Sequence, residues 1–577
     1  MTSTAPAPTG VDTDRLDAAI TSLRTGIEKW AGMSLAERAA LVGATHEAIG
    51  RVAQRWTRTA TDIKGIAPSS PLVGEEWLSG PYATLAGFGT VAHSLATLAD
   101  GGSPLAGVKP KAVAGNRLAW PVLPLGIRES LLFNGFSAQV WTLPGVSEAE
   151  VREGVGLGAL RPGESNGVGL VLGAGNITSI GPLDVLSELV AHNRSTILKI
   201  NPTFANLLSA YRGALAPLIE ADLVRVVQGG AAEGEYLCNH DGISHVHITG
   251  SIVTHDAIVW GRGADADRRR KAGEPLLTKP ITSELGGVSP IIIVPGKWSA
   301  ADLRFQAENV ATMRLHNAGH NCIAGQVVVL SSGWGQREEF LAELRKAMAK
   351  IPNRTPWYPG SDSRLAGALA DAAGAHEQSE TFADGNRVLI QVEAGSDAPV
   401  ERTEYFAPVL GVVALDGDAQ GFLERAVDYA NNELTGTLGA NILVAPAEHK
   451  KLGRSFGEAV ANLRYGSIGI NAWTGLAFLT PTATWGAFPG HTLDDAQSGI
   501  GTVHNGLLIP DVERTVVSGP FRPFPRSVVG GELALFPKPP WFVTSRSAGS
   551  TGSKLSSFAA APSWLKLPGI FASAFRA

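Results

Sequence analysis

Cysteine is scarce in this chain, which holds only Cys238 and Cys322 in 577 residues. Two thiols exclude the disulfide framework that stabilises small secreted domains. The sequence also lacks an apolar, charge-free run of about 20 residues, the length that a membrane-spanning helix needs. Its first residues, MTSTAPAPTGVDTD, have neither the basic nor the apolar region of a secretory signal. We therefore expect an intracellular protein of the cytoplasm.

An excess of positive charge is absent too. The 48 Lys and Arg residues are outnumbered by 53 Asp and Glu residues, which leaves a net charge of −5. Nucleic acid is therefore not an expected partner. With 44% hydrophobic and 18% charged residues the chain is typical of globular proteins, and its length predicts more than one structural unit.

Acidic residues are missing from the end of the chain. The segment from Leu533 to Ala577 contains no Asp or Glu but five basic residues, together with PKPPWF and the small, polar run SRSAGSTGSKLSS. We interpret this C-terminal extension, residues 531–577, as a flexible tail or one that packs on a neighbouring subunit. An alternative is an apolar, basic surface that makes peripheral contact with anionic lipid or with an apolar substrate.

The arrangement of apolar residues predicts an α/β fold. Residues from about 14 to 100 have helical spacing, and from Gly167 apolar strand runs alternate with helices, one of them expected over residues 205–221. The first series includes GVGLVLGAG, STILKI, LVRVVQGG and HVHITGS, and the second includes SPIIIVPG, GQVVVLSS, RVLIQVEAG, VLGVVAL and TLGANILV. Strands that alternate with helices at this spacing form parallel sheets with right-handed crossovers, so two α/β units are expected.

Several short motifs do not meet the structural context that they require. GESNG, at 163–167, precedes a strand instead of following one, so we interpret it as a turn and not as a nucleophile elbow. GAGNIT lacks the third glycine and the acidic residue of a dinucleotide fingerprint, and GSTGSK lacks the ending of a phosphate loop.

A metal site is a weaker alternative. The run CNHDGISHVH brings Cys238, His240, His245 and His247 within ten residues, but it has no second cysteine at a zinc-ligand spacing. His245 and His247 alternate along one strand face, which favours exposed histidines or histidines satisfied in the core. We predict no metal, and we expect Cys238 to be a small buried apolar residue.

Cys322 has different surroundings, because it lies in the loop HNAGHNCIAG. Such a Gly/Asn loop can present a thiol and offer its amides to a developing negative charge. With a free pKa of about 8.5, a thiol needs a nearby base to act as a nucleophile at neutral pH. Glu284, which lies 38 residues upstream in ITSELGGVSP, is a candidate general base, followed by paired glycines that allow a close backbone approach.

Taken together, these blocks resemble the NAD(P)-dependent aldehyde dehydrogenase superfamily, which uses a nucleophilic cysteine. ELGGVSP resembles the family's Glu-Leu-Gly-Gly-Lys-Ser-Pro block, and NAGHNCIAG resembles its Asn-x-Gly-Gln-x-Cys block with His320 in the glutamine's place. HITGS, EYFAPVL, YGSIGINAW and QSGIG resemble further family elements in the family's order. The resemblance covers about 330 residues, from about Gly167 to Gly501.

The resemblance implies a role for each matching position. Cys322 would attack the aldehyde carbonyl to give a thiohemiacetal, and the Asn176 side chain with the Cys322 backbone amide would stabilise the oxyanion. After hydride transfer to NAD or NADP, Glu284 would activate the water that hydrolyses the thioester. The cofactor positions implied are Lys199, Gly229, Gly230, Thr249, Gly250, Ser251, Leu285, Glu404 and Phe406.

This sequence departs from the family pattern at a few positions. Pro202 stands where NAD-preferring members often have a glutamate, so NADP is as open as NAD. The basic insertion 262–273 is either a solvated loop or a contact for a phosphate. Thr502 and Val503 replace a family Arg-Glu pair, which argues against an auxiliary proton relay, and His320 beside the nucleophile is unusual.

The resemblance also implies an architecture of two Rossmann-like parallel-sheet domains with a small β oligomerisation element. Residues 1–135 and 165–283 would form the cofactor domain, 284–490 the catalytic domain, and 136–164 with 500–530 the oligomerisation element of a homodimer or homotetramer.

The function expected is oxidation of an aldehyde to the carboxylic acid. The aromatic residues between Ile470 and Phe488 favour an apolar or aromatic substrate. One alternative is a CoA-acylating aldehyde dehydrogenase or acyl-CoA reductase, against which Glu284 argues. The other is a non-catalytic relative that acts as a binding protein, against which Cys322, Glu284 and Asn176 argue together.

Overall fold

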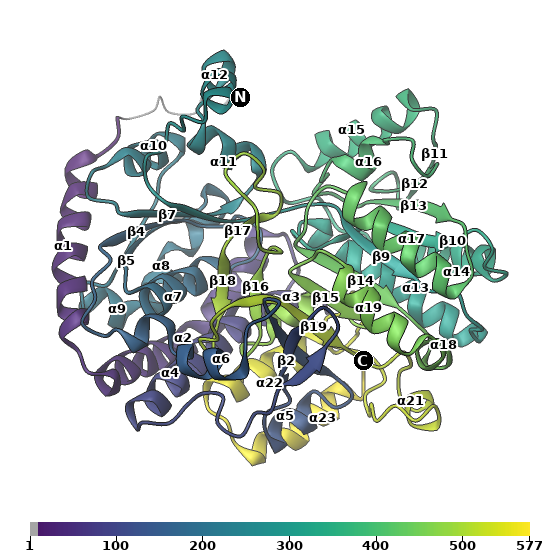
Figure 1. Ribbon diagram of the computed structural model, residues 1–577, viewed down its shortest axis with the longest axis horizontal. Helices are drawn as coiled ribbons and strands as arrows, with labels where there is room; N and C mark the ends of the chain where they lie inside the picture. The colour runs from purple at the N-terminus through teal and green to yellow at the C-terminus, as the bar shows by residue number, and fades with distance from the viewer. Residues whose placement is uncertain (1–9) are drawn as a thin grey trace.

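The computed structural model describes residues 10–577 and contains two large β-sheets with helices packed around them (Figure 1). A six-stranded sheet lies on the left of Figure 1 and an eleven-stranded sheet on the right. The recurrence of parallel strands and helices confirms the predicted α/β class with two Rossmann-like sheets.

The N-terminal segment forms helices, as its spacing predicted. α1 (Thr13–Gly32), α2 (Leu35–Ile63) and α4 (Ala83–Ala99) each bury an apolar stripe, and Trp30 and Trp56 are completely buried. α2 begins with a capping box in which the Ser34 amide donates to the Glu37 carboxylate at 2.8 Å. The π-helical turn η1 (Leu78–Tyr82) follows α3 (Val73–Trp77) directly and leads into α4.

The six-stranded sheet has the strand order β17-β8-β7-β4-β5-β6, and only the β17–β8 pair is antiparallel. Its strands are β4 (Val168–Leu172), β5 (Ser195–Lys199), β6 (Val224–Val227), β7 (His245–Gly250), β8 (Ile281–Leu285) and β17 (Gly499–Ile500). The helices between them are α7 (Ile180–His192), η3 (Pro202–Leu207), α8 (Leu208–Ala214), α9 (Ala216–Glu220), α10 (Ala231–Asn239), α11 (Ile252–Val259) and α12 (Gly263–Ala272).

The single helix predicted over 205–221 is wrong, because this stretch is divided among η3, α8 and α9. Pro217 lies in the first turn of α9, and a proline cannot continue a preceding helix since it lacks an N–H and crowds the turn before it. The chain therefore leaves helical geometry at Leu215, with φ −97° and ψ 12°.

The eleven-stranded sheet has the order β1-β2-β3-β19-β15-β14-β9-β10-β13-β12-β11. Every residue of β9 and β10 is buried, which explains their nearly continuous apolar runs, since parallel strands are covered on both faces. The strands are β1 (Lys111–Val113), β2 (Arg117–Leu123), β3 (Ser137–Thr142), β9 (Ser289–Ile293), β10 (Gly325–Ser331), β11 (Gln378–Phe382), β12 (Arg387–Val392), β13 (Val409–Leu415), β14 (Gly439–Leu443), β15 (Ser467–Ile470) and β19 (Val512–Ser518). The helices around it are α13 (Ala300–Leu315), η4 (His316–Gly319), α14 (Arg337–Lys350), α15 (Ser361–Gly374), α16 (Pro399–Arg402), α17 (Ala419–Asn432), α18 (Pro446–Leu452), α19 (Arg454–Asn462) and α20 (Gly475–Leu479).

The two segments expected to form an oligomerisation element, 136–164 and 500–530, extend this sheet within one chain. β3 pairs antiparallel with β19, and β19 pairs in parallel with β15, where Thr515 lies opposite Ser467. The remaining elements of this region are α5 (Ile127–Leu132), α6 (Glu148–Gly154), η2 (Leu157–Leu160), β16 (Thr484–Gly486) and β18 (Thr502–Asn505).

The C-terminal extension folds onto its own chain, so the prediction of a flexible tail is wrong. Its helices are α22 (Ala548–Ala560), η5 (Trp564–Lys566) and α23 (Leu567–Ala574), which follow the short α21 (Arg526–Val529). α22 packs so closely on α3 that a Cβ on Gly74 would collide with the backbone of Ala548. Leu555 and Ile570 are buried here. The burial of these apolar side chains orders a segment whose small, polar run had predicted flexibility.

No helix within residues 10–577 is both long enough and apolar enough to span a bilayer.

Candidate active site

The carboxyl ends of parallel strands collect the predicted residues in one cleft. Lys199 ends β5, Gly250 ends β7 and Glu284 lies at the end of β8, while Cys322 lies on the loop before β10. Such strand ends lie at one edge of a sheet, which is where α/β proteins bind ligands. Of the predicted residues the cleft is lined by Asn176, Lys199, Gly230, Thr249, Gly250, Ser251, Glu284, Cys322, Glu404 and Phe406. Gly229 and Leu285 are outside its lining, and Leu285 is buried with its amide donating to the Ser498 carbonyl at 2.8 Å.

The thiol and the carboxylate are in direct contact. Cys322 Sγ donates to Glu284 Oε1 at 3.2 Å. Burial raises the pKa of Glu284, and burial together with the neighbouring Glu284 raises the pKa of the Cys322 thiol well above its ordinary value. Ionisation of either group is therefore less favourable than in water, and the thiol proton lies between the two. Glu284 can accept this proton as the sulfur attacks.

Asn176 lines the same cleft, and hydrogen bonds hold both its side chain and its backbone carbonyl. Its side-chain Nδ2 donates to the His320 carbonyl at 3.0 Å. Its own carbonyl accepts from Lys64 Nζ at 3.0 Å and from Asn317 Nδ2 at 3.1 Å. The Asn176 side-chain amide is thus bound to the carbonyl of His320, which precedes Cys322 by two residues.

The cysteine loop enters its turn through two consecutive left-handed residues. Asn317 has φ 54° and Ala318 has φ 56°, and alanine rarely adopts this conformation because its Cβ crowds the backbone. The surrounding protein compensates, since Asn317 Oδ1 accepts from Lys64 at 3.0 Å and the Asn317 amide donates to Glu75 at 3.2 Å. Strain of about 1–3 kcal/mol per residue persists only where such contacts determine the conformation.

These contacts belong to a buried ionic cluster that sequence reasoning missed. Lys64 at the end of α2 pairs with Glu76 at 2.7 Å, with both side chains inaccessible to solvent, and Glu75 pairs with Arg354 at 2.7 Å. Burial lowers the pKa of Lys64, and the charge of Glu76 opposes that effect. The three charges, Lys64, Glu75 and Glu76, flank a Gly/Pro/Ser-containing loop, and no local pattern marks them as buried.

Glu404 faces the paired glycines that follow Glu284. A Cβ on Gly286 would collide with the Glu404 carboxylate, which explains why this position has no side chain. Glu404 Oε1 is buried without a hydrogen-bond partner, and burial raises the pKa of Glu404 to about 8 in spite of Arg314 nearby. This oxygen is free to accept a hydrogen bond from a ligand in the cleft.

The comparisons with known proteins agree with this geometry. The model of the aldehyde dehydrogenase family matches residues 196–411. The chain is 27% identical over 234 residues to the 4-trimethylaminobutyraldehyde dehydrogenase of Bos taurus, which covers 36% of this chain and 42% of that relative. The resemblance to the aldehyde dehydrogenase superfamily is confirmed.

Solved structures of aldehyde dehydrogenases share the fold over most of the chain. A variant of aldehyde dehydrogenase C from Pseudomonas syringae, in complex with NAD+ and octanal, has a TM-score of 0.56 at 17% identity and covers 87% of this chain and 88% of its own. The NADP-dependent glyceraldehyde-3-phosphate dehydrogenase of Bacillus halodurans, in complex with NADP, also has a TM-score of 0.56 at 17% identity, with 88% and 92% covered. The sequence alignments are shorter, since they span 42–49% of the curated relatives.

His320 replaces the glutamine of the family block, and it faces away from the thiol. Its Nδ1 donates to the Phe406 carbonyl at 2.8 Å, and its ring packs beside Trp357 and Tyr358 at centroid distances of 5.5 and 5.4 Å. Burial lowers the pKa of His320 to about 3, so the ring is neutral. His320 therefore supports Phe406, which lines the cleft.

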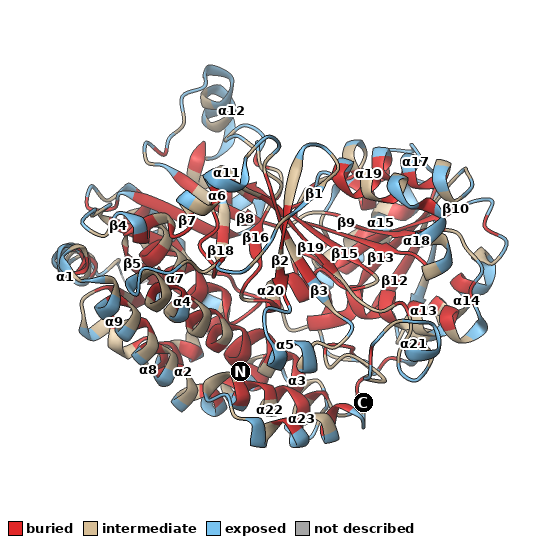
Figure 2. Cartoon of the chain, turned by 60° about the horizontal axis from the view of Figure 1, so that its bottom comes forward, coloured by how far each residue is buried: buried red, intermediate tan, exposed pale blue. Residues whose placement is uncertain are grey.

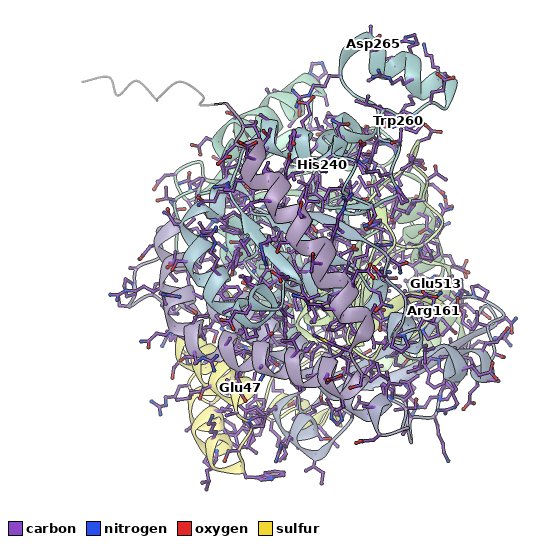
Figure 3. The ribbon with its side chains drawn as sticks, turned by 90° about the vertical axis from the view of Figure 1, so that its left-hand side faces the viewer. Glu47, Arg161, His240, Trp260, Asp265 and Glu513 are labelled. Atoms are coloured by element: carbon purple, nitrogen blue, oxygen red, sulfur yellow. The ribbon has the colours of Figure 1, made fainter. Side chains whose placement is uncertain are left out.

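The basic insertion, 262–273, is a helix where a solvated loop was one interpretation. α12 projects from the molecule with Asp265 near its tip and Trp260 at its base (Figure 3). Arg270 pairs with Asp256 at 2.8 Å, while Arg262 and Arg269 line the cleft. Other lining residues that the motifs did not mark are Asn201, Tyr358 and Arg364.

The histidines near Cys238 do not converge on a common point. His245 meets Glu188 at 3.2 Å, His247 meets Asp184 at 3.6 Å and His240 meets Asp17 at 3.2 Å. Cys238 is a free, buried thiol with its pKa raised to about 11, chiefly by burial. Across residues 10–577 no group of three or more acidic, His or Cys side chains could hold a metal ion.

A second, mainly apolar pocket also reaches the thiol. Cys322 and Glu284 line both spaces. Most other walls of the pocket are apolar, and Trp473, Phe478 and Trp485 come from the aromatic segment 470–488. Cys322, the nucleophile that the resemblance implies, thus borders both a polar and an apolar space.

Proposed function

We propose that the protein oxidises an apolar or aromatic aldehyde to its carboxylic acid with NAD+ or NADP+, through a thiohemiacetal and a thioester on Cys322. The observation that carries the proposal is the 3.2 Å contact between Cys322 and Glu284 at the junction of the polar cleft and the apolar pocket. One space suits a dinucleotide, the other suits an apolar substrate, and the reacting groups lie where the two meet.

The residues present fit a nicotinamide dinucleotide. The unpartnered Glu404 Oε1 would accept a ribose hydroxyl beside Phe406, and Lys199 at its strand end would hold the other ribose. The amides at the start of α10, with Gly229 and Gly230, would face the pyrophosphate together with Thr249, Gly250 and Ser251 nearby. Pro202 in the cleft lining offers no carboxylate to repel a 2′-phosphate, so both dinucleotides fit. When bound, the nicotinamide accepts a hydride.

Acylation follows from the geometry of the thiol. Cys322 Sγ forms a bond to the carbonyl carbon as its proton passes to the Glu284 carboxylate 3.2 Å away. The carbonyl oxygen becomes an oxyanion, which the Asn176 side-chain amide and the Cys322 backbone amide stabilise. For this the Asn176 amide exchanges its present acceptor, the His320 carbonyl, for the substrate oxygen. Loss of hydride from the carbon leaves a thioester.

Deacylation is assigned to Glu284. Glu284 first releases to solvent the proton that it took from the thiol. The raised pKa makes the ionised carboxylate a better base than an exposed glutamate, so it then takes a proton from the water that attacks the thioester. The Cys322 thiolate leaves and regains a proton from Glu284, and the carboxylic acid is released. A CoA-acylating enzyme would transfer the acyl group to a thiol instead, and it would not need this base.

The test is nucleotide reduction by aldehydes without CoA, followed by the absorbance of the reduced nicotinamide. Cys322→Ala should lower turnover by roughly a thousandfold or more, because no other group can form the acyl intermediate. The matched control is Cys238→Ala, which removes the other free thiol and should keep turnover.

Glu284→Gln removes the base of both steps, because Glu284 accepts the thiol proton before it activates water. In the same assay its turnover should fall roughly a hundredfold or more below that of the wild type. Steady turnover of the wild type only after CoA is added would favour the acyl-transferring alternative. Dinucleotide binding without any acyl intermediate would favour a binding protein.

A further inference from the structure

We propose that the C-terminal extension builds a second, apolar chamber that takes the hydrocarbon chain of a long-chain aliphatic aldehyde whose carbonyl lies at Cys322. This inference rests on the proposed aldehyde oxidation and names its substrate class. It also assigns a function to residues 531–577, which lie beyond the segment that resembles the family.

Two apolar cavities follow one another from the thiol outward. The inner one, next to Cys322, is the apolar pocket described above. The outer one has a volume of about 70 Å³. The two share four wall residues, Leu78, Trp473, Leu479 and Trp541, so the cavities lie against each other and a chain that occupies both would pass between these side chains.

The walls of the outer cavity suit a hydrocarbon and little else. Its only charged side chain is Lys538, which is already paired with Glu308 and Thr544. The other walls are mainly apolar, including the stacked Phe305 and Phe542 with ring centroids 5.4 Å apart. A charged or strongly polar ligand would lose its hydration here without gaining a hydrogen-bond partner. Each methylene buried here, in contrast, stabilises binding because it is removed from water.

The extension supplies 11 of the 26 residues that line the outer cavity, from Ala534 to Ala574. These walls are held in place by contacts with the body of the protein. Ser556 Oγ donates to the Trp77 carbonyl at 3.3 Å, and Trp541 packs edge-on against Phe136 at a centroid distance of 5.4 Å. The chamber is therefore part of the folded structure.

The rim of the chamber is apolar and exposed. Leu132 and Phe133 line the cavity at the end of α5, and on the same helix Ile127 has 73% of its surface exposed. Leu533 is 74% exposed beside the lining residue Ala534. Figure 2 shows α5 near α22 and α23 on the face that is turned forward. An exposed apolar rim is where an apolar chain would first leave water.

The test is a chain-length series of linear aldehydes: butanal, octanal, dodecanal and hexadecanal. In the wild type we expect kcat/KM to rise about 3-fold per added methylene until the chamber is filled. Ile570→Phe narrows the chamber from α23 and should lower kcat/KM for dodecanal by about tenfold or more while butanal, which ends in the inner pocket, is unaffected.

The matched control is Leu565→Phe, the same kind of change at an exposed position of the extension that lines neither cavity. It should leave the whole series unchanged. A flat series in the wild type, or an equal loss for butanal and dodecanal in Ile570→Phe, would overturn the chamber and leave the proposed aldehyde oxidation intact.

A binding measurement tests the chamber even if the protein oxidises no aldehyde. Dodecanoic acid should bind Cys322→Ala more tightly than hexanoic acid in calorimetry, and Ile570→Phe in the same background should remove that difference. Equal binding of the two acids would contradict the chamber. If no aldehyde of any length reduces the nucleotide, the proposed oxidation fails, whereas the acid-binding result still decides the chamber.

Discussion

Single residues in the cleft show how burial sets their chemistry. Cys322, Glu284 and Glu404 all have raised pKa values, with burial as the first cause in each. Their partners differ: Glu284 meets a thiol, while Glu404 Oε1 meets no polar atom. Glu404 therefore stays protonated at pH values where an exposed glutamate is ionised.

Glu404 gives a prediction for stability against pH. Its folded pKa of about 8 lies above the ordinary 4.5, so its favourable contribution is complete below pH about 4.5 and is lost as pH rises through about 8. Between these limits the wild type should lose on the order of 3–5 kcal/mol relative to Glu404→Gln. Urea unfolding of both proteins, without nucleotide, at pH about 5, 7 and 9 measures this difference.

The control for this comparison is the exposed Glu338, since Glu338→Gln should not alter the pH dependence. A constant difference between wild type and Glu404→Gln over the whole range would contradict the buried, protonated acid.

At the scale of elements, helices remote in sequence position the reacting loop. The end of α2 and the helix α3 reach the cysteine loop through Lys64, Glu75 and Glu76. The same α3 supports α22, where Gly74 allows close packing. The N-terminal helices thus connect the reacting loop to the C-terminal extension.

Lys64→Met tests this connection. It leaves Glu76 as an unpaired buried charge, so we expect a loss of about 3–5 kcal/mol in the free energy of unfolding. It also releases the Asn176 carbonyl and Asn317, so we expect kcat to fall about tenfold or more. Urea unfolding and nucleotide reduction measure the two effects.

Two further variants separate these effects. Arg51→Met on the exposed face of α2 is the control and should change stability by less than about 0.5 kcal/mol. Combining Lys64→Met with Glu76→Leu should recover stability. It should leave kcat low, because the Asn176 carbonyl still lacks the hydrogen bond from Lys64. Full kcat in that stable double variant would show that Lys64 has no positioning role.

At the scale of the whole molecule, the segments expected to form an oligomerisation element contribute strands to the eleven-stranded sheet of their own chain. Within the described residues, 10–577, β19 has a partner strand on each side, β3 and β15, in its own chain. The homodimer or homotetramer implied by the resemblance stays a prediction, as does contact of the extension with anionic lipid. A second copy cannot add a strand beside β19, because both edges of β19 are already paired.

Sedimentation velocity at several protein concentrations tests the oligomer. A mass of two or four chains is expected, and a single chain at every concentration would contradict the implied assembly. The helices α5 and α21, at the lower side of Figure 1, each carry exposed apolar side chains that a second copy could cover.

The sequence by itself determined the strands and the nucleophile's surroundings. Apolar runs such as SPIII and QVVVL are long enough to predict buried parallel strands, and the blocks around Glu284 and Cys322 are local patterns that can be read along the chain. What it could not determine depends on contacts between distant residues. The break at Leu215, the pairing of Lys64 with Glu76, the neutral His320 and the chamber under the extension all arise from packing, because burial and partner distance exist only once the chain has folded.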